Sequence, residues 1–140
     1  MKKFIAASIA GIIVGIIAWS FIIVGAGALI LSDSGTVKMG TDRIPSFIAY
    51  DTEARRTYTK NEIANGISTH TSTYATGIRA EEYMQWLVDT DNWIIVDFGR
   101  RIAKTSDRDE YILALNATDN IDGTITITIR KGRGTLEIYD

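Results

Sequence analysis

The chain has 140 residues, the usual size of one domain, and a formal net charge of −2. Residues 32–140 hold 13 of the 15 basic and all 17 acidic side chains, a net charge of −4, which argues against a nucleic-acid-binding surface. The chain contains no cysteine, so disulfides, thiolate catalysis and cysteine-based metal sites are excluded.

The first 31 residues predict a transmembrane anchor. Residues 4–31 form a run of 28 residues without a charge, nine of them isoleucine. Roughly 20 apolar residues cross a bilayer core of about 30 Å, so this run is long enough to span with tilt. A cleaved secretory signal is the alternative, because the sequence from Ala26 to Ala28 has the small-x-small pattern of a cleavage site, but signal cores are shorter. A processed type IV pilin is a third reading, although the expected leader and glutamate are missing.

The flanking charges predict the orientation of this anchor. Lys2 and Lys3 precede the run, and Asp33 is the first charge after it. Positive residues stay cytoplasmic, so we expect a cytoplasmic N-terminus and a C-terminal domain that is periplasmic or extracellular.

A strip of small residues follows one face of the predicted transmembrane helix. Ala7, Gly11 and Gly15 are spaced four residues apart and include a GxxxG motif. Such strips let two helices approach closely, so we expect self-association through this helix or packing on other membrane proteins. The bilayer and these proteins are the partners that the sequence predicts.

The domain after the anchor begins with a tether and a first pair of elements. Residues 32–43 predict a short tether with an edge strand at 36–39, and residues 44–140 the folded domain. Residues 46–50, just after Pro45, predict a strand. Thr59 and Glu62 have capping-box spacing, which predicts a short helix that begins at Thr59 and weakens at Gly66.

The middle of the domain predicts an exposed connection and then a second helix. Residues 68–76 are rich in hydroxyl groups, which is typical of an exposed loop. Apolar residues then recur at helical spacing, which predicts a helix over 78–88 with its charged residues outward.

The last third of the chain predicts strands at 93–98, 110–116, 123–130 and 135–139. In the third, Ile125, Ile127 and Ile129 alternate with threonines, which indicates one buried and one hydroxylated face. Residues 131–134, with the sequence KGRG, predict the turn of a final hairpin.

These elements predict an α+β fold. Short connections favour a mainly antiparallel sheet of four to six strands, with two helices on one face. The order β-β-α-α-β-β-β-β is loosely similar to that of PAS-like sensor domains, and less so to the cone-shaped domains of bitopic secretion components. The similarity is one of architecture, without shared motifs.

The polar residues predict no catalytic, cofactor or metal site. His70, the sole histidine, is flanked by hydroxyl residues, but there is no nucleophile-elbow motif, and we expect it on the surface of a polar loop. The carboxylates of residues 89–91, 107–110 and 119–122 resemble oxygen ligands for calcium, yet turn formation explains them better. Tyr74, an aromatic residue in the hydroxyl-rich stretch, is the candidate for contact with a partner.

We therefore expect a single-pass membrane protein that presents a small non-enzymatic interaction domain. It would be a structural component of a membrane complex, an envelope machine or a membrane-containing virion. The alternatives are a ligand-sensing domain of PAS-like shape and, less well supported, a membrane-tethered hydrolase.

Overall fold

The computed structural model describes residues 4–9 and 35–139, and side-chain environments for residues 35–136. Six strands are hydrogen-bonded in the order β4-β5-β9-β8-β7-β6, and every neighbouring pair is antiparallel. The strands are β4 (Arg55–Ala64), β5 (Ile67–Ala75), β6 (Ile94–Val96), β7 (Arg101–Thr105), β8 (Tyr111–Asp119) and β9 (Thr124–Tyr139). A 3₁₀ turn, η1 (Asp97–Gly99), joins β6 to β7.

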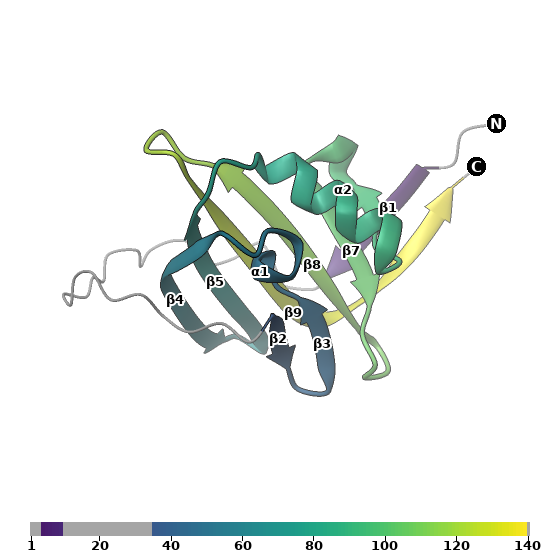
Figure 1. The fold of residues 1–140 in the computed structure, drawn as a ribbon. Coiled ribbons are helices and arrows are strands. Elements are labelled where there is room, and N and C mark those ends of the chain that lie inside the picture. The colour runs from purple at the N-terminus through teal and green to yellow at the C-terminus, as the bar shows by residue number, and fades with distance from the viewer. Residues whose placement is uncertain (1–3, 10–34, 140) are drawn as a thin grey trace.

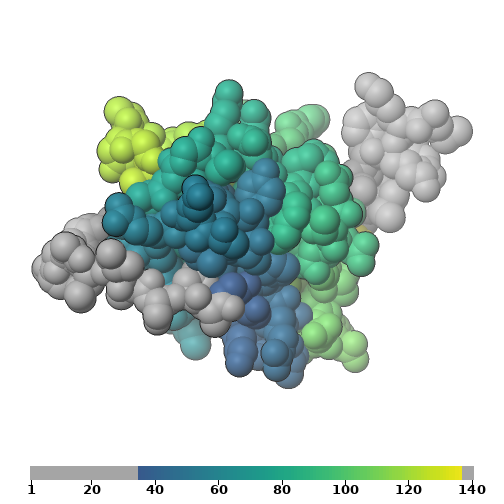
Figure 2. Space-filling model, in the orientation of Figure 1, coloured from purple at the N-terminus to yellow at the C-terminus, as the bar shows by residue number. Residues whose placement is uncertain are grey.

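Two helices and a β-hairpin cover one face of this sheet, here called the inner face (Figure 1). They are α1 (Phe47–Tyr50), α2 (Ala80–Thr90), and the antiparallel pair of β2 (Thr36–Met39) and β3 (Asp42–Pro45). The same elements fill the near side of the molecule in Figure 2. An antiparallel sheet with helices on one face is an α+β fold, so the predicted class is confirmed.

The core lies between the inner face and these covering elements. Leu87 of α2 and Leu115 of β8 are completely buried, and Phe47 of α1 is as well. Three buried aromatic rings pack together within this core, since Phe47 lies 5.2 Å from both Tyr74 and Tyr83, centroid to centroid. Burial of this apolar surface is the main contribution that holds the helices on the sheet.

Several predicted elements agree with the structure. The helix predicted over 78–88 is α2, and the strand predicted at 36–39 is β2. The strand predicted at 110–116 is the first part of β8. In β9 the side chains of Ile125, Ile127 and Ile129 are buried, whereas the threonines between them are only partly so. Alternation therefore identified the buried face of β9 correctly.

Three local predictions were wrong. Residues 46–50 are not a strand, because the Ser46 hydroxyl accepts the amide of Ile48 and caps helix α1. The helix predicted from Thr59 lies instead in strand β4, and residues 68–75 of the predicted loop lie in strand β5, its hairpin partner. Threonine suits a strand once a neighbouring strand is present to pair with it.

The predicted hairpin turn at residues 131–134 is also wrong, because β9 continues through it without a break. Gly132 pairs with Ile112, and the amide of Gly134 donates to the carbonyl of Glu110. Beyond β8, the last part of β9 pairs with β1 (Phe4–Ile9), which lies beside it in Figure 1. Ile112 and Ala114 of β8 pack with Leu136 of β9 in a second, smaller apolar cluster.

The N-terminal segment differs in part from its prediction. Residues 4–9, expected to begin a transmembrane helix, form strand β1, while residues 10–31 lie outside the described part of the chain. None of the helices in the described segments is both long and apolar enough to cross a bilayer.

Candidate functional site

A groove opens where the β2–β3 hairpin meets the ends of β4 and β5. We call it the hairpin groove. Its volume is about 420 Å³, and it is an open groove and not an enclosed cavity. One wall comes from the β2–β3 hairpin and the other from β4 and β5; the lining residues are Lys38, Met39, Gly40, Asn61, Glu62, Ile63, Ser68 and Thr69.

A chain of hydrogen bonds fixes one wall of the groove. The Nδ1 atom of His70 lies 2.7 Å from Oδ1 of Asn61, and its Nε2 atom lies 2.7 Å from Oγ of Ser72. An amide oxygen can only accept, so Nδ1 carries the proton and donates to Asn61, while Nε2 is hydrogen-bonded to the serine hydroxyl. The chain therefore holds Asn61, an exposed residue of β4, in one orientation at the groove.

This histidine is not where the sequence placed it. His70 was expected on the surface of a loop, yet it is 6% exposed and lies in β5. Residues 70, 72 and 74 share the inner face because side chains alternate along a strand. The hydroxyl of Ser72 is also buried, with 2% exposure, so the Asn61–His70–Ser72 chain positions groups and does not present a nucleophile to a substrate.

Tyr74, the predicted partner contact, is likewise buried. Its exposure is 1%, and its ring packs on Phe47 of α1. Tyr74 stands opposite Ile125 of β9 and belongs to the core. The hydroxyl-rich neighbours of Tyr74 suggested an exposed loop, but they alternate with the inward residues of a strand.

A buried ion pair fixes the other wall of the groove. The ammonium of Lys131 lies 2.8 Å from Oδ2 of Asp42 and donates to the carbonyl of Met39 at 3.0 Å. Ser106 Oγ and the amide of Asp107 also donate to the Asp42 carboxylate, at 2.6 and 2.7 Å. Lys131 and Asp42 are 8% and 5% exposed, so their charges stabilise the fold only as a hydrogen-bonded pair.

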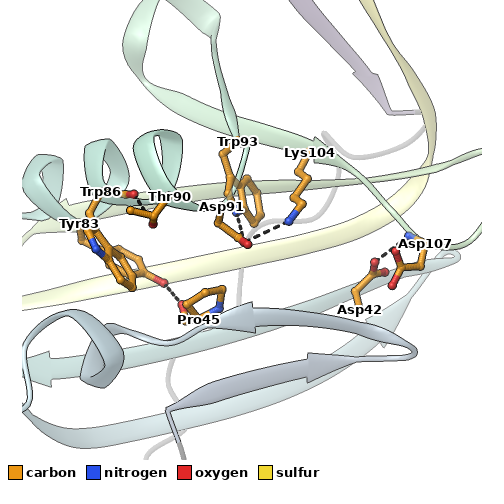
Figure 3. A network of polar contacts seen from close by, with 9 residues as sticks. All are labelled: Asp42, Pro45, Tyr83, Trp86, Thr90, Asp91, Trp93, Lys104 and Asp107. Atoms are coloured by element: carbon orange, nitrogen blue, oxygen red, sulfur yellow. Dashed lines mark hydrogen bonds and ion pairs between the residues drawn. The ribbon is translucent and has the colours of Figure 1, made fainter.

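The charge of Asp42 depends on these donors. Burial alone would raise the pKa of its carboxyl, but the hydrogen bonds from Lys131, Ser106 and the Asp107 amide, with the positive charge of Lys131, lower that pKa below its ordinary value of 3.8. Figure 3 shows the contact between Asp42 and Asp107. Asp42 is therefore ionised at neutral pH.

The turn between β2 and β3 requires a glycine. Gly40 has a φ of +67°, and a Cβ atom built there would lie 2.8 Å from Nζ of Lys131. The backbone at Gly40 therefore packs directly against the buried ammonium group of Lys131.

The other end of β3 is attached to helix α2. In Figure 3, Asp42 and Pro45 lie at opposite ends of β3, and the hydroxyl of Tyr83 donates to the carbonyl of Pro45 at 2.7 Å. The hairpin is therefore held at both ends, by the ion pair at Asp42 and by the tyrosine at Pro45.

The remaining polar candidates serve the fold. Asp119 accepts the amide of Ala80 at the start of α2, and Asp122 accepts the amide and hydroxyl of Thr124 in the turn before β9. Within residues 35–136, no three histidine, aspartate or glutamate side chains gather closely enough to hold a metal ion. Of the predicted packing strip, Ala7 lies in β1 opposite Leu136, and Gly11 and Gly15 lie outside the described residues.

Reasoning from the sequence missed Lys131, Asp42 and Asn61. A signal for Lys131 was present, since the alternation of Ile125, Ile127 and Ile129 continues to position 131 if the strand does not end at the glycines. The partners of Lys131 lie far away in the sequence and carry no such signal.

Comparison with known proteins adds no assignment: the chain matches no family model and no curated protein, and its fold matches no solved structure.

Proposed function

We propose that this chain is a single-pass membrane protein whose C-terminal domain, outside the cytoplasm, is a non-enzymatic interaction module of a larger membrane assembly. The uncharged run of 28 residues carries the proposal, because a segment of this length and composition is what a bilayer core accepts. Strand β2 begins five residues after the run ends at Leu31, so the domain would lie close to the membrane surface.

The burial of the histidine and its serine neighbour favours a binding function over a hydrolytic one. The sole histidine and its serine neighbour are buried and hydrogen-bonded to each other. An acyl-transfer enzyme needs its nucleophile within reach of the substrate carbonyl. These residues instead support the wall of a groove.

An exposed aromatic residue is the best candidate for contact with a partner protein. Phe98 is fully exposed in η1, where Asp97, Phe98 and Gly99 all have positive φ values, of 52°, 57° and 90°. Such conformations cost free energy in residues other than glycine and concentrate at functional sites. The carboxylate of Asp97 pairs with Arg101, which holds the turn in this form.

The anchor and strand β1 exclude each other. The pairing of Ser8 with Thr135 keeps β1 on the same side of the membrane as the domain. A helix through residues 10–31 would be about 33 Å long and would put residues 9 and 32 on opposite sides of a bilayer. Our proposal therefore requires β1 to leave β9 when the chain is anchored.

A disulfide experiment separates these two states. Positions 8 and 135 are Cα partners in the β1–β9 ladder, and directly opposed strand residues lie within disulfide range. Since the natural chain has no cysteine, Ser8→Cys with Thr135→Cys gives a single possible crosslink. We expect none when the full-length chain is oxidised in its native membrane.

The matched control is Thr73→Cys with Thr126→Cys, which are Cα partners in β5 and β9 and should crosslink in either state. Complete crosslinking of the 8–135 pair in the membrane fraction would contradict a single span through residues 10–31.

The interaction module is tested separately, by chemical crosslinking in native membranes and mass spectrometry. We expect a stoichiometric neighbour whose yield falls when Phe98→Ser is introduced. Ile121→Ser, which removes an equally exposed apolar side chain from the β8–β9 turn, is the control. Equal loss from both variants would argue against a specific contact at Phe98.

A further inference from the structure

The lining of the hairpin groove contains one basic and one acidic side chain, Lys38 and Glu62. Glu62 is its only acidic side chain, and its carboxylate already pairs with Lys60 at 3.1 Å. Lys38 is exposed, and its ammonium makes no ion pair within the described chain. The groove thus presents an uncompensated positive charge at its mouth, which favours a negatively charged ligand.

The amide of Asn61 adds a second, directed donor. Its oxygen is occupied by His70, which leaves the NH₂ group without a partner among the described residues. His70 is in turn held by Ser72, so the amide cannot rotate freely. A donor that is oriented before binding loses little entropy when a ligand arrives.

The same groove offers apolar surface beside these donors. Ile63 is 78% exposed on the wall formed by β4, which is an unusual exposure for isoleucine. Met39 on the opposite wall is 7% exposed and belongs to the core, so Ile63 is the apolar side chain that the groove exposes. A ligand with an apolar body would cover Ile63 and gain the free energy of removing that surface from water.

We infer that the hairpin groove binds a small amphipathic anion, a carboxylate attached to a short apolar body. Lys38 and the amide of Asn61 bind the carboxylate, and Ile63 contacts the apolar part. This binding is independent of the membrane anchor and of the contact at Phe98. It adds a ligand site to a domain proposed above to bind other proteins.

The test uses 3-phenylpropanoate as the probe and the full-length chain in nanodiscs of zwitterionic lipid. Binding is followed by amide chemical shifts in ¹H–¹⁵N NMR spectra. We expect saturable shifts confined to residues 38–40, 61–63 and 68–69. The uncharged analogue 3-phenylpropanamide, which has the same apolar body, should bind about fivefold more weakly, as expected for loss of one exposed ion pair.

Three variants assign the interaction to the groove. Lys38→Met removes the charge and keeps the aliphatic stem, and it should weaken binding of 3-phenylpropanoate about fivefold while leaving the amide unaffected. Ile63→Ser should weaken both compounds. Arg100→Met removes an exposed charge from another part of the surface and should change neither.

Three results would overturn the inference. The first is that millimolar 3-phenylpropanoate causes no chemical-shift changes, or causes them outside the groove. The second is equal affinity for 3-phenylpropanoate and 3-phenylpropanamide. The third is that Lys38→Met and Arg100→Met weaken binding of 3-phenylpropanoate equally. Both Lys38 and Ile63 are exposed, so their replacement leaves the fold intact and each result is interpretable.

Discussion

The two ends of the inner face of the sheet are buried to similar extents but by different chemistry. Under helix α2, Tyr83, Leu87 and Leu115 form an apolar core. Under the β2–β3 hairpin, Val37, Met39 and Ile44 extend this core, but His70 of β5 and Lys131 of β9 are buried there as well. The inner face therefore gains buried polar groups toward the hairpin.

The difference shows what each end requires of its covering element. Apolar contact is not directional, so a helix can bury its face on the sheet through shape alone. A buried charge needs a partner with the right geometry, so the hairpin must bring Asp42 to Lys131. The polar end is the more exacting of the two, and it is also where the groove lies.

The largest effect is expected from a charge placed in the apolar core. Ile127 is 3% exposed, and Ile127→Asp should unfold the domain, because burial of an unpaired carboxylate costs more than the total stability of about 5–15 kcal/mol typical of a domain. Circular dichroism and urea titration would measure the loss. Thr126→Asp, one residue away on the opposite face, should cost about 1 kcal/mol or less. Equal damage from both would mean that β9 is buried on both faces.

The next effect concerns the buried ion pair. Asp42→Ala leaves the ammonium of Lys131 buried without its carboxylate and should lower the free energy of unfolding by about 3–5 kcal/mol. Asp42→Leu combined with Lys131→Met removes both charges and should be clearly less destabilised than Asp42→Ala. If the double variant is less stable than Asp42→Ala, the attraction between the two charges exceeds the free-energy cost of burying them.

Acid should weaken the hairpin end selectively. Because the folded state lowers the pKa of Asp42, the carboxylate stabilises the fold fully above pH 3.8, and this contribution is lost as the pH falls below that value. Asp42→Asn lacks the titrating group. The difference in unfolding free energy between the natural chain and this variant should shrink below about pH 4. A constant difference from pH 7 to pH 2 would show that Asp42 does not titrate with folding.

The smallest effect is expected from a single hydrogen bond that joins the two ends. Tyr83→Phe removes the donor to the carbonyl of Pro45 and keeps the ring packing. The unfolding free energy should fall by about 1 kcal/mol. Tyr58→Phe, which alters a half-buried tyrosine on the edge strand β4, is the comparison. Equal values would mean that the contact with β3 adds no stability.

The elements that the sequence determined by itself are those with a repeating apolar pattern of sufficient length. Helix α2 has its apolar residues at helical spacing, and the first half of β9 alternates strictly between isoleucine and threonine. In both elements the signal is local, because the period of a helix or a strand determines which residues share its buried side. The N-terminal run also predicts a membrane anchor from its composition alone, and that remains a prediction.

Only the tertiary structure decided the elements whose local signals were short or ambiguous. A capping-box spacing at Thr59 indicated a helix, but the antiparallel ladder with β5 gives hydrogen bonds to alternate residues along the whole stretch and so outweighs one cap. The glycines after Lys131 indicated a turn, yet β8 and then β1 continue to pair with β9 on either side of them. The site was decided in the same way, because Lys131 reaches Asp42 across 89 positions of the sequence and no local pattern can specify such a contact.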